Sequence, residues 1–439
     1  MSVARRSAPH PSPPAAARDV QTARSDAVKF DVIIIGAGAA GLAAARELAG
    51  RNIAIVEARD RIGGRIHTLH PTDLALPIEL GAEFVHGEAK ATFSIIDSAA
   101  LLAYQLPDDH WWSRDGAWEE VDFWKDLDRL FAKIGTRDRS FADFLDSRRV
   151  APRVREMAWH FVEGYHAAHT DRITALALRT ADGETTAMKQ FRIANGYDAL
   201  IAWLRAGVAD PQSLRLSTTV KEIRWKRGDV EVDCGTETLR AKAALITIPI
   251  GVWKAPRDQE EAIRFVPELE SKRKAIEKLE VGHVVKIVFR FREPFWKEPY
   301  NFVHANDRFM PTWWTCAPAR APLLTGWAGG HAADAMIAEG ADAMIDRAID
   351  SMARVFGVRR SLIHRSLVAT WTHDWQRDPF SRGAYSYAGV GGIDAHKALA
   401  KPVESTLFFA GEATNGEQTG TVAGAIVSGQ TAARRIKAL

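Results

Sequence analysis

A glycine-rich turn that directly follows a short apolar strand restricts the fold of this chain more than any other feature. Val32–Ile35 is a β-branched run typical of a buried parallel strand. The turn that follows it has the sequence Gly36-Ala37-Gly38-Ala39-Ala40-Gly41. In such a turn Gly36 allows the tight bend, Gly38 lets the backbone approach a pyrophosphate, and Gly41 permits close packing of a helix on the strand. Strand, turn and helix together predict a Rossmann-type α/β domain that binds a dinucleotide.

The next strand ends in an acidic residue that bears on which dinucleotide is bound. Asn52–Val56 is the expected second strand, and Glu57 follows it, 21 residues after Gly36. A carboxylate at this point can accept a hydrogen bond from a ribose 2′-hydroxyl and repels a 2′-phosphate, which disfavours NADP. The helix after Gly41 presents unpaired N–H groups and a partial positive charge to the phosphates.

Beyond this unit, two styles of sequence alternate along the chain. Residues 89–212 are mostly helical in pattern, strands return between 214 and 248, and Val284–Phe291 alternates as one long strand. Residues 333–356 predict a single amphipathic helix, and the end of the chain returns to a strand, a glycine-rich turn and a helix. We therefore expect two interleaved domains. The expected division is a flexible tail at 1–28, a dinucleotide-binding domain at 29–88, 213–283 and 403–439, and a substrate-binding domain at 89–212 and 284–402.

Tryptophans interleave with acidic residues in the segment 108–124. The pattern favours a surface helix of charged and aromatic side chains. The alternative is an entrance that attracts cations to a site.

The charge balance and the cysteine count exclude several classes of protein. Lys and Arg number 58 against 55 Asp and Glu, so the net charge is +3 and nucleic acid is not an expected partner. The cysteines, Cys234 and Cys316, form no CxxC motif, which excludes a disulfide framework and a cysteine-rich metal site. The sequence has no HxxxH or HExxH motif and no cysteine cluster, so no metal is expected, and without a Gly-x-Ser-x-Gly elbow no acyl-transfer triad is expected. Without a signal-peptide core or a run of about 20 apolar residues, we expect a cytoplasmic protein without a membrane span.

Further motifs along nearly the whole chain resemble those of the flavin amine oxidase family. They are Glu57-Ala58-Arg59-Asp60-Arg61-Ile62-Gly63-Gly64-Arg65, Leu80-Gly81-Ala82-Glu83, Ile248-Pro249-Ile250-Gly251-Val252, Phe409-Ala410-Gly411-Glu412 and Gly420-Thr421-Val422. The resemblance implies the family's fold, a Rossmann-type FAD-binding domain interleaved with a substrate domain of mixed sheet and helices. It also implies noncovalent FAD, because Ala384 stands where covalent members have the cysteine that binds the flavin.

The resemblance assigns the cofactor site residue by residue. The residues that it places at FAD are Gly36, Gly38, Ala39, Ala40, Gly41, Glu57, Ala58, Arg59, Gly63, Gly64, Arg65, Gly81, Ala82, Glu83, Val220, Gly411, Glu412, Thr421 and Val422. Glu412 is expected to accept a hydrogen bond from a ribityl hydroxyl, and the helix after Thr421 to direct N–H groups at the flavin N1/C2=O edge. Val220 would contact the adenine side through its backbone, and its alternative role is that of strand core.

The same resemblance places four residues at the reacting centre. Lys286 interrupts the apolar strand and would make a water-bridged contact with flavin N5, where its charge assists electron transfer to O2. Tyr385 matches one wall of the family's aromatic cage, whereas the opposite wall falls at Thr421. The two-sided cage of monoamine oxidases is therefore absent or rebuilt from other residues. His86, in a His-Gly ending seen among polyamine oxidases, is expected either as a substrate contact or as a structural histidine.

The implied activity is FAD-dependent oxidation of an amine. A hydride equivalent leaves the α-carbon for flavin N5, the imine hydrolyses to a carbonyl compound, and reoxidation by O2 gives H2O2. The expected partners are a small-molecule amine and O2, with neither nucleic acid nor membrane, and with a homo-oligomer left open. The alternatives are a flavin-dependent desaturase or dehydrogenase of a larger apolar substrate, and a non-catalytic FAD-binding scaffold. The family's histone-demethylating branch is not expected, because no long helical insertion interrupts the chain.

Overall fold

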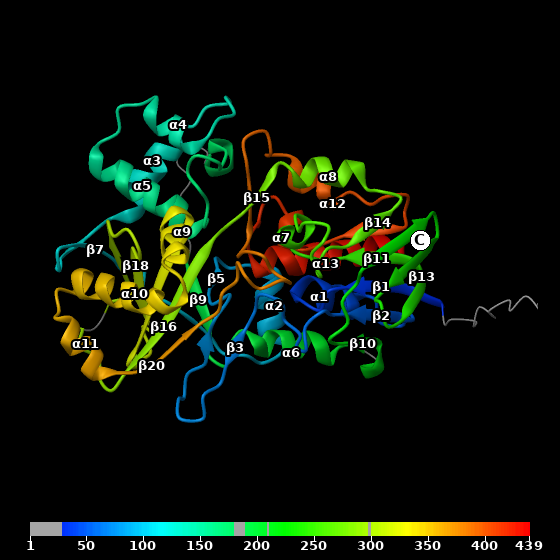
Figure 1. Cartoon of the computed structure of the whole chain (residues 1–439), viewed down its shortest axis with the longest axis horizontal. Coiled ribbons are helices and arrows are strands. Elements are labelled where there is room, and N and C mark those ends of the chain that lie inside the picture. The colour runs from blue at the N-terminus through cyan, green and yellow to red at the C-terminus, as the bar shows by residue number, and fades with distance from the viewer. Residues whose placement is uncertain (1–28, 180–188, 209, 297–299) are drawn as a thin grey trace, which may run out of the picture.

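In the computed structural model, the chain forms two units, each built on its own sheet, at the two ends of the longest axis of the molecule (Figure 1). The structure describes residues 29–179, 189–208, 210–296 and 300–439. The tail expected at 1–28 lies outside these residues.

The first sheet has eight strands, and its strand β1 carries the glycine-rich turn. Its strands, in order across the sheet, are β10 (Leu214–Arg215), β2 (Ile53–Val56), β1 (Lys29–Ile35), β13 (Thr238–Ile246), β12 (Asp229–Asp233), β11 (Glu222–Lys226) and β14 (Arg264–Val266), with β22 (Leu407–Phe409) paired to β13. β1 lies parallel to both β2 and β13, and β22 lies parallel to β13. The carboxyl ends of these strands therefore meet at one edge, which is where open α/β sheets bind ligands.

Two helices rich in alanine and glycine pack closely beside the glycine-rich turn. They are α1 (Ala39–Glu47) and α13 (Val422–Lys437). A Cβ placed at Gly41 would lie 1.9 Å from the carbonyl oxygen of Gly36, and one at Gly429 would lie 2.1 Å from that of Ala40. Both distances are far below contact, so glycine at these positions allows the two helices and the turn to approach.

Helices α2 (Lys90–Ser98) and α6 (Asp198–Ala206) belong to the same hydrophobic core as β1 and α1. Ile95 on α2 and Leu200 on α6 are buried in it. Both helices fall within the segment 89–212, which we expected in the substrate-binding domain. The division into domains stays a prediction, and this packing leads us to propose that both helices form part of the dinucleotide-binding domain.

The second sheet has seven strands and carries Lys286 on β16. Its strands, in order, are β20 (Leu367–Thr372), β16 (Val284–Phe291), β19 (Leu323–Gly329), β18 (Thr312–Thr315), β17 (Phe302–Ala305), β7 (His110–Arg114) and β8 (Ala117–Glu120). Its helical neighbours are α9 (Gly330–Glu339), α10 (Ala341–Phe356) and α11 (Arg360–Ser366), and a further helical group comprises α3 (Phe123–Phe131), α4 (Phe141–Asp146) and α5 (Pro152–Tyr165) (Figure 1).

Short strands pair with one another outside the two main sheets. The short strands pair as β3 (Thr68–Leu69) with β4 (Ile78–Glu79), β15 (Leu279–Val281) with β21 (Ser386–Ala388), and β9 (Gln190–Ile193) with both β5 (Val85–His86) and β6 (Ala103–Gln105). The remaining short α-helices are α7 (Ile250–Trp253), α8 (Glu270–Ile276) and α12 (Ala395–Ala400).

The segment 108–124 is a β-hairpin followed by a helix, so the expected surface helix is wrong. Strands β7 and β8 pair antiparallel, and Asp115 and Gly116 at the turn have φ values of 50° and 83°. Two consecutive residues with positive φ are typical of tight hairpin turns. Trp112 is buried in the sheet, and only the last residues of the segment enter α3.

The segment 333–356 is also not a single helix. Helices α9 and α10 span it separately, and they meet at Gly340, whose φ is 84°. This backbone conformation suits glycine and ends the first helix. By contrast, the strand expected over Val284–Phe291 and the C-terminal helix are confirmed by β16 and α13.

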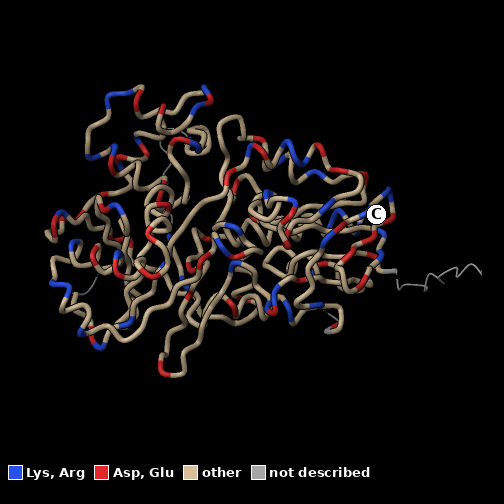
Figure 2. The backbone as a smooth tube through the Cα atoms, viewed as in Figure 1, with Lys and Arg blue, Asp and Glu red and all other residues tan. Residues whose placement is uncertain are grey.

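The distribution of charged residues over the molecule is consistent with the nearly equal numbers of basic and acidic residues in the sequence. Figure 2 shows Lys and Arg interspersed with Asp and Glu over both units. Within the described ranges, no helix is both long enough and apolar enough to cross a membrane.

Candidate functional site

A cavity of about 610 Å³ contains nearly all of the expected site residues in its wall. Its dinucleotide end is lined by Gly36, Gly38, Glu57, Ala58, Arg59, Gly63, Gly64, Val220, Thr247 and Pro249. Its middle is lined by Arg65, Gly81, Ala82, Glu83, Lys286, Tyr385, Gly411, Glu412, Thr421 and Val422. The part that we call the aromatic end is lined by Phe84, His86, His110, Phe123, Trp124, His160, Phe161, Gly164, Tyr165, His166, Phe302, His304, Thr312, Trp314 and Trp327. Ala39 and Ala40 also line the cavity, whereas Gly41 does not and serves helix packing instead.

At the dinucleotide end, the backbone fixes the carboxylate of Glu57. Its Oε2 accepts a hydrogen bond of 2.8 Å from the Ala37 N–H, and its Oε1 accepts one of 2.9 Å from the Arg59 N–H. Each carboxylate oxygen keeps a further lone pair for a ligand hydroxyl. The carboxylate therefore lies at the end of β2 in a position to bind a ribose.

The space at Gly38 tests whether these residues fit a bound cofactor. A Cβ at Gly38 would approach no protein atom more closely than the carbonyl oxygen of Gly63, at 3.9 Å. The protein itself therefore does not require glycine here, and the open space belongs to the cavity. The residues present fit a group that needs close contact with this backbone, as a pyrophosphate does.

Glu412 is bound more fully by the protein than the sequence suggested. Its Oε1 accepts from Arg65 at 3.0 Å, while its Oε2 accepts from the Ser386 hydroxyl at 2.7 Å and the Gly420 N–H at 3.1 Å. The carboxylate thus joins the end of β22 to β21 and to the turn before α13. The expected contact with a ribityl hydroxyl stays a prediction.

Thr421 is the N-cap of α13. Its hydroxyl accepts a hydrogen bond of 2.9 Å from the Gly424 N–H and donates one of 2.8 Å to the Gln418 carbonyl. This places the helix N-terminus at the cavity wall, where its N–H groups favour negative charge. Because the cap uses the hydroxyl in both directions, we assign Thr421 to the helix cap and not to a wall of an aromatic cage.

Lys286 lies in a buried group of charges in the middle of the cavity wall. Its Nζ is 2.7 Å from Glu83 Oε2 and donates to the Gly81 carbonyl at 3.2 Å. The other oxygen of Glu83 accepts from Arg192 at 2.8 Å and from the Trp314 indole at 3.0 Å. Burial raises the pKa of Glu83, but the charges of Lys286 and Arg192 outweigh this and hold the pKa below its usual value. Two cations against one carboxylate leave this group with a net positive charge.

The sequence motifs placed Glu83 at the cofactor and did not predict its contact with Lys286. The two residues are far apart in the chain and meet because β16 lies beside the Gly81 segment. Arg192 on β9 was not expected at the site at all. A single arginine in a short strand of polar and apolar residues has no local motif that would identify it as a site residue.

Tyr385 is held in place by its own hydroxyl. The hydroxyl donates to the Tyr165 carbonyl at 2.8 Å, and burial raises the pKa of both tyrosines, so both phenols are neutral. Trp314 on β18 and Trp327 on β19 line the cavity with them. The aromatic wall opposite Tyr385 is therefore not supplied by position 421, and other elements contribute the aromatic rings.

His86 lies in the wall of the aromatic end. Its ring packs edge-on against Tyr165 at 5.2 Å between centroids, and its Nδ1 has no hydrogen-bond partner among the described residues. Burial lowers the pKa of His86 to about 4. The ring is neutral and lies in the cavity wall, but its unpartnered Nδ1 is buried, so the expected substrate contact stays a prediction.

Three further histidines form a buried chain that the sequence did not reveal. His160 Nε2 lies 2.9 Å from His304 Nδ1, and His304 Nε2 lies 2.9 Å from His110 Nδ1. His110 Nε2 lies 3.1 Å from the exposed carboxylate of Asp108. Burial lowers the pKa of His160 to about 4 and that of His304 further. The neutral imidazoles of His160 and His304 thus line the aromatic end together with the aromatic rings.

Comparisons with known proteins agree with this geometry. The family model described as flavin containing amine oxidoreductase matches residues 39–157 and 118–437. Polyamine oxidase 3 of Oryza sativa subsp. japonica is 30% identical, over 92% of this chain and 88% of that protein. Lysine-specific histone demethylase 1 homolog 2 of Arabidopsis thaliana is 26% identical, and the match covers 92% of this chain but 58% of that protein.

Two solved structures share the fold. Cyclohexylamine oxidase from Brevibacterium oxydans IH-35A is 22% identical with a TM-score of 0.79, and the match covers 93% of this chain and 99% of that chain. Wild-type putrescine oxidase bound to putrescine is 21% identical with a TM-score of 0.78, with 94% and 100% covered. The expected fold class is confirmed.

Proposed function

Because this chain belongs to the family of flavin-containing amine oxidoreductases, we propose that it uses noncovalently bound FAD to oxidise a small apolar amine, with O2 as acceptor. The observation that carries the proposal is a single cavity that extends from the glycine-rich turn past Lys286 to the aromatic end. The bound flavin would supply the redox chemistry, taking a hydride equivalent from the α-carbon of the amine and giving two electrons to O2, so that the products would be an imine, which hydrolyses to a carbonyl compound, and H2O2.

The cofactor would be held by backbone groups and a few fixed side chains. Gly38 leaves room for the pyrophosphate, Gly36 allows the tight turn beside Thr247, and Glu57 offers its carboxylate to a ribose. The N-terminus of α13, capped by Thr421, supplies N–H groups that stabilise negative charge on the reduced cofactor. Ala384 has no side-chain nucleophile, which supports noncovalent binding.

Lys286 supplies positive charge where electrons leave for O2. Its pairing with Glu83 fixes the ammonium in place, and Arg192 on the same carboxylate keeps the group positive as a whole. A fixed positive charge in a buried site stabilises superoxide-like negative charge more than the same charge does in water.

The lining of the aromatic end favours an amine without a second charged group. None of the residues assigned above to the aromatic end carries a carboxylate, and burial lowers the pKa of His86, His160 and His166 to about 4, so these three imidazoles are neutral at neutral pH. The carboxylates that bond to this lining, Glu83 and Asp108, already accept hydrogen bonds from several protein donors. A buried ammonium without a counter-ion costs several kcal/mol, whereas a cation–π contact returns only about 0.5–2 kcal/mol. The reacting amine therefore enters the reaction as the neutral base, and a single amine on an apolar skeleton is preferred to a polyamine.

A matched pair of substrates tests this preference. Hexylamine and 1,6-diaminohexane have the same chain and differ by one terminal amine. We expect kcat/KM for H2O2 formation to be roughly 100-fold higher for hexylamine at neutral pH, because the second ammonium has no partner. Equal or higher efficiency with the diamine would show a polyamine-type site and would overturn the substrate class. Absence of turnover with either, and with other simple amines, would overturn the activity itself.

A further inference from the structure

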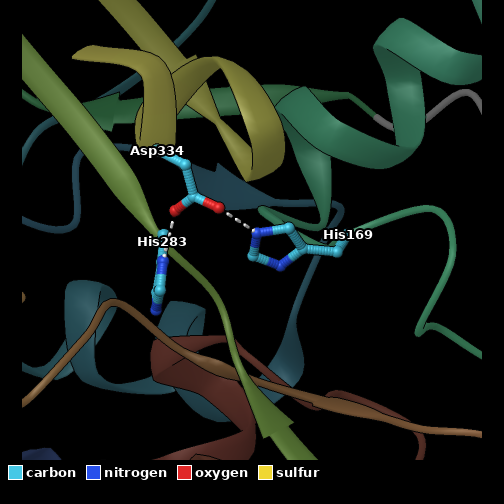
Figure 3. Close-up of side chains that lie close together, drawn as sticks. All are labelled: His169, His283 and Asp334. Atoms are coloured by element: carbon cyan, nitrogen blue, oxygen red, sulfur yellow. Dashed lines mark hydrogen bonds and ion pairs between the residues drawn. The ribbon is translucent and has the colours of Figure 1, made fainter. Parts of the chain in front are cut away.

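A second group of ligand-type side chains lies outside the cavity, at the junction of three elements. His169 follows α5, His283 directly precedes β16, and Asp334 lies on α9. Figure 3 shows the carboxylate of Asp334 between the two imidazoles, with one oxygen toward each ring. His169 Nε2 is 2.7 Å from Asp334 Oδ2, and His283 Nδ1 is 2.6 Å from Asp334 Oδ1. One nitrogen from each histidine and one carboxylate oxygen all lie within 4.8 Å of one another.

In this group the side chain of His169 is buried, whereas those of His283 and Asp334 are open to solvent. The side chain of His169 is 1% exposed, and its other nitrogen, Nδ1, lies 3.3 Å from the Tyr387 hydroxyl. Such a partner on the far nitrogen is the usual way in which a metal-binding histidine is oriented. The side chains of His283 and Asp334 are 36% and 43% exposed, so an ion can enter and water can complete its coordination.

The surroundings are favourable for a cation. Glu163 and Asp171 both approach the ring of His331, and this ring lies 4.8 Å from that of His169. Three carboxylates are therefore gathered around three imidazoles. Glu163 occupies the Nδ1 of His331, so His331 supports the charge of the site and is not counted among the ligands.

We propose that His169, His283 and Asp334 bind one divalent transition-metal ion of the zinc class, with water as the remaining ligand. Two imidazole nitrogens and one carboxylate oxygen are donors that zinc and its neighbours prefer, whereas Mg²⁺ and Ca²⁺ prefer oxygen alone. Metal binding would replace the two hydrogen bonds to Asp334, and the rings would move to admit the ion between the ligand atoms, which now lie within 4.8 Å of one another. Each imidazole would bind the ion through the nitrogen that now faces Asp334 and keep its proton on the other nitrogen. The oxidation state of the ion would not change on binding.

The site would join three elements next to the reacting centre. The residue before His283 is Gly282, whose N–H donates to the Tyr385 carbonyl at 2.7 Å and whose carbonyl accepts from Ala384 at 2.8 Å. The loop that carries His169 follows Tyr165, whose carbonyl accepts the Tyr385 hydroxyl. Metal binding is therefore expected to stabilise the segment that positions Tyr385, in addition to α9.

The test is metal binding to the tag-free, FAD-loaded protein after removal of metals with a chelator. Zinc titrated in competition with a chromogenic chelator should bind at one equivalent per chain, and Co²⁺ should give the visible absorption of a tetrahedral site. His283→Ala and Asp334→Asn should each weaken zinc binding at least tenfold, whereas His364→Ala, which removes an exposed histidine on α11, should leave it unchanged.

Retained flavin absorbance in each variant shows that it is folded, and Asp334→Asn serves if His283→Ala does not fold. Loss of the single equivalent in the folded variants supports the proposal. Stoichiometric binding that persists in both variants places the metal elsewhere and overturns the proposal, as does an affinity no higher than that of isolated surface histidines. None of these readouts depends on amine turnover, so failure here is distinct from failure of the proposed function.

Discussion

At the residue scale, the proposed reaction with O2 depends on the charge around Lys286. Glu83 accepts from Lys286, Arg192 and Trp314, so this carboxylate is fully enclosed by donors. With two cations and one anion, the group keeps one positive charge in the cavity wall. Removal of Lys286 would make it neutral while Arg192 still holds the carboxylate.

Lys286→Met should therefore slow the reaction with O2 more than the reaction with the amine. Because a preorganised charge in a buried site typically contributes tenfold or more to a charge-forming step, we expect flavin reoxidation to slow by roughly 10- to 100-fold. Stopped-flow measurements of the two half-reactions separate the effects. Arg290→Met on the same strand, whose partner is the exposed Asp73, is the control and should leave both unchanged. Reoxidation at the wild-type rate in Lys286→Met would contradict the role of the charge.

The histidines of the aromatic end set the expected pH dependence. Burial lowers the pKa of His86 and of His160 to about 4, so both stay neutral above about pH 6. Burial raises the pKa of Glu79, which interacts with Lys286 and Glu83, to about 7, so this carboxyl and the substrate amine both titrate near neutral and alkaline pH, and only the ionisation of the amine changes with the substrate. We expect kcat/KM to rise about tenfold per pH unit below the pKa of the amine, as the neutral form increases.

The measurement compares two amines of different basicity. The inflection should shift to lower pH with the less basic amine, benzylamine, than with hexylamine. A flat profile, or an inflection that stays fixed when the amine changes, would assign the titration to the protein and count against reaction of the free base.

Single residues were predictable where a motif fixes their type and position. Glu57 and Lys286 both line the cavity, as the motifs indicated. Glu57 directly follows a strand and Lys286 lies within one, and the apolar pattern of both strands is clear in the sequence. The partners of these residues were not predictable. Arg192 and the chain of His160, His304 and His110 come from separate segments, and only the packed fold brings them together.

At the element scale, two glycines of the glycine-rich turn have different roles: Gly38 lies at the proposed cofactor site, and Gly41 permits close packing of α1. A Cβ fits the protein at Gly38, where the nearest atom lies 3.9 Å away, but at Gly41 it would lie 1.9 Å from the Gly36 carbonyl oxygen. Gly38→Ala should fold and bind FAD roughly 100-fold more weakly, because its methyl group enters the cavity. Gly41→Ala should lower the free energy of unfolding by about 1–3 kcal/mol or prevent folding, because α1 must move away from the turn.

Flavin content by absorbance and Tm by circular dichroism distinguish the two variants. Normal FAD affinity in Gly38→Ala would contradict the placement of the pyrophosphate. An unchanged Tm in Gly41→Ala would contradict the packing argument.

Elements were predictable where one period dominates the sequence. Val284–Phe291 is a strand as expected because it is a continuous β-branched and aromatic run. Over 108–124, acidic and aromatic residues gave no clear period, and the hairpin was missed although Asp115-Gly116 is a residue pair that tight hairpin turns favour. The break at Gly340 was missed because the apolar pattern continues on both sides of it, although the glycine itself was a signal.

At the scale of the whole molecule, the cavity is a joint product of both units. β1 of the first unit and the turn after it supply the dinucleotide end and the start of α13 supplies part of the middle, while β16, β18 and α5 of the second unit supply Lys286 and part of the aromatic end. Motifs indicated each part separately, but the sequence could not show how the parts meet. In the resulting arrangement, the glycine-rich turn, the buried Lys286 and the aromatic end all line one cavity.

The most direct measurement is an anaerobic titration of the purified yellow protein with hexylamine, followed by readmission of air. We expect the flavin absorbance to bleach with one equivalent of amine per flavin, and colour to return in air together with one equivalent of H2O2. Bleaching without rapid return of colour would contradict O2 as the acceptor. A flavoprotein that no amine bleaches, or a protein that binds no FAD, would contradict the central claim.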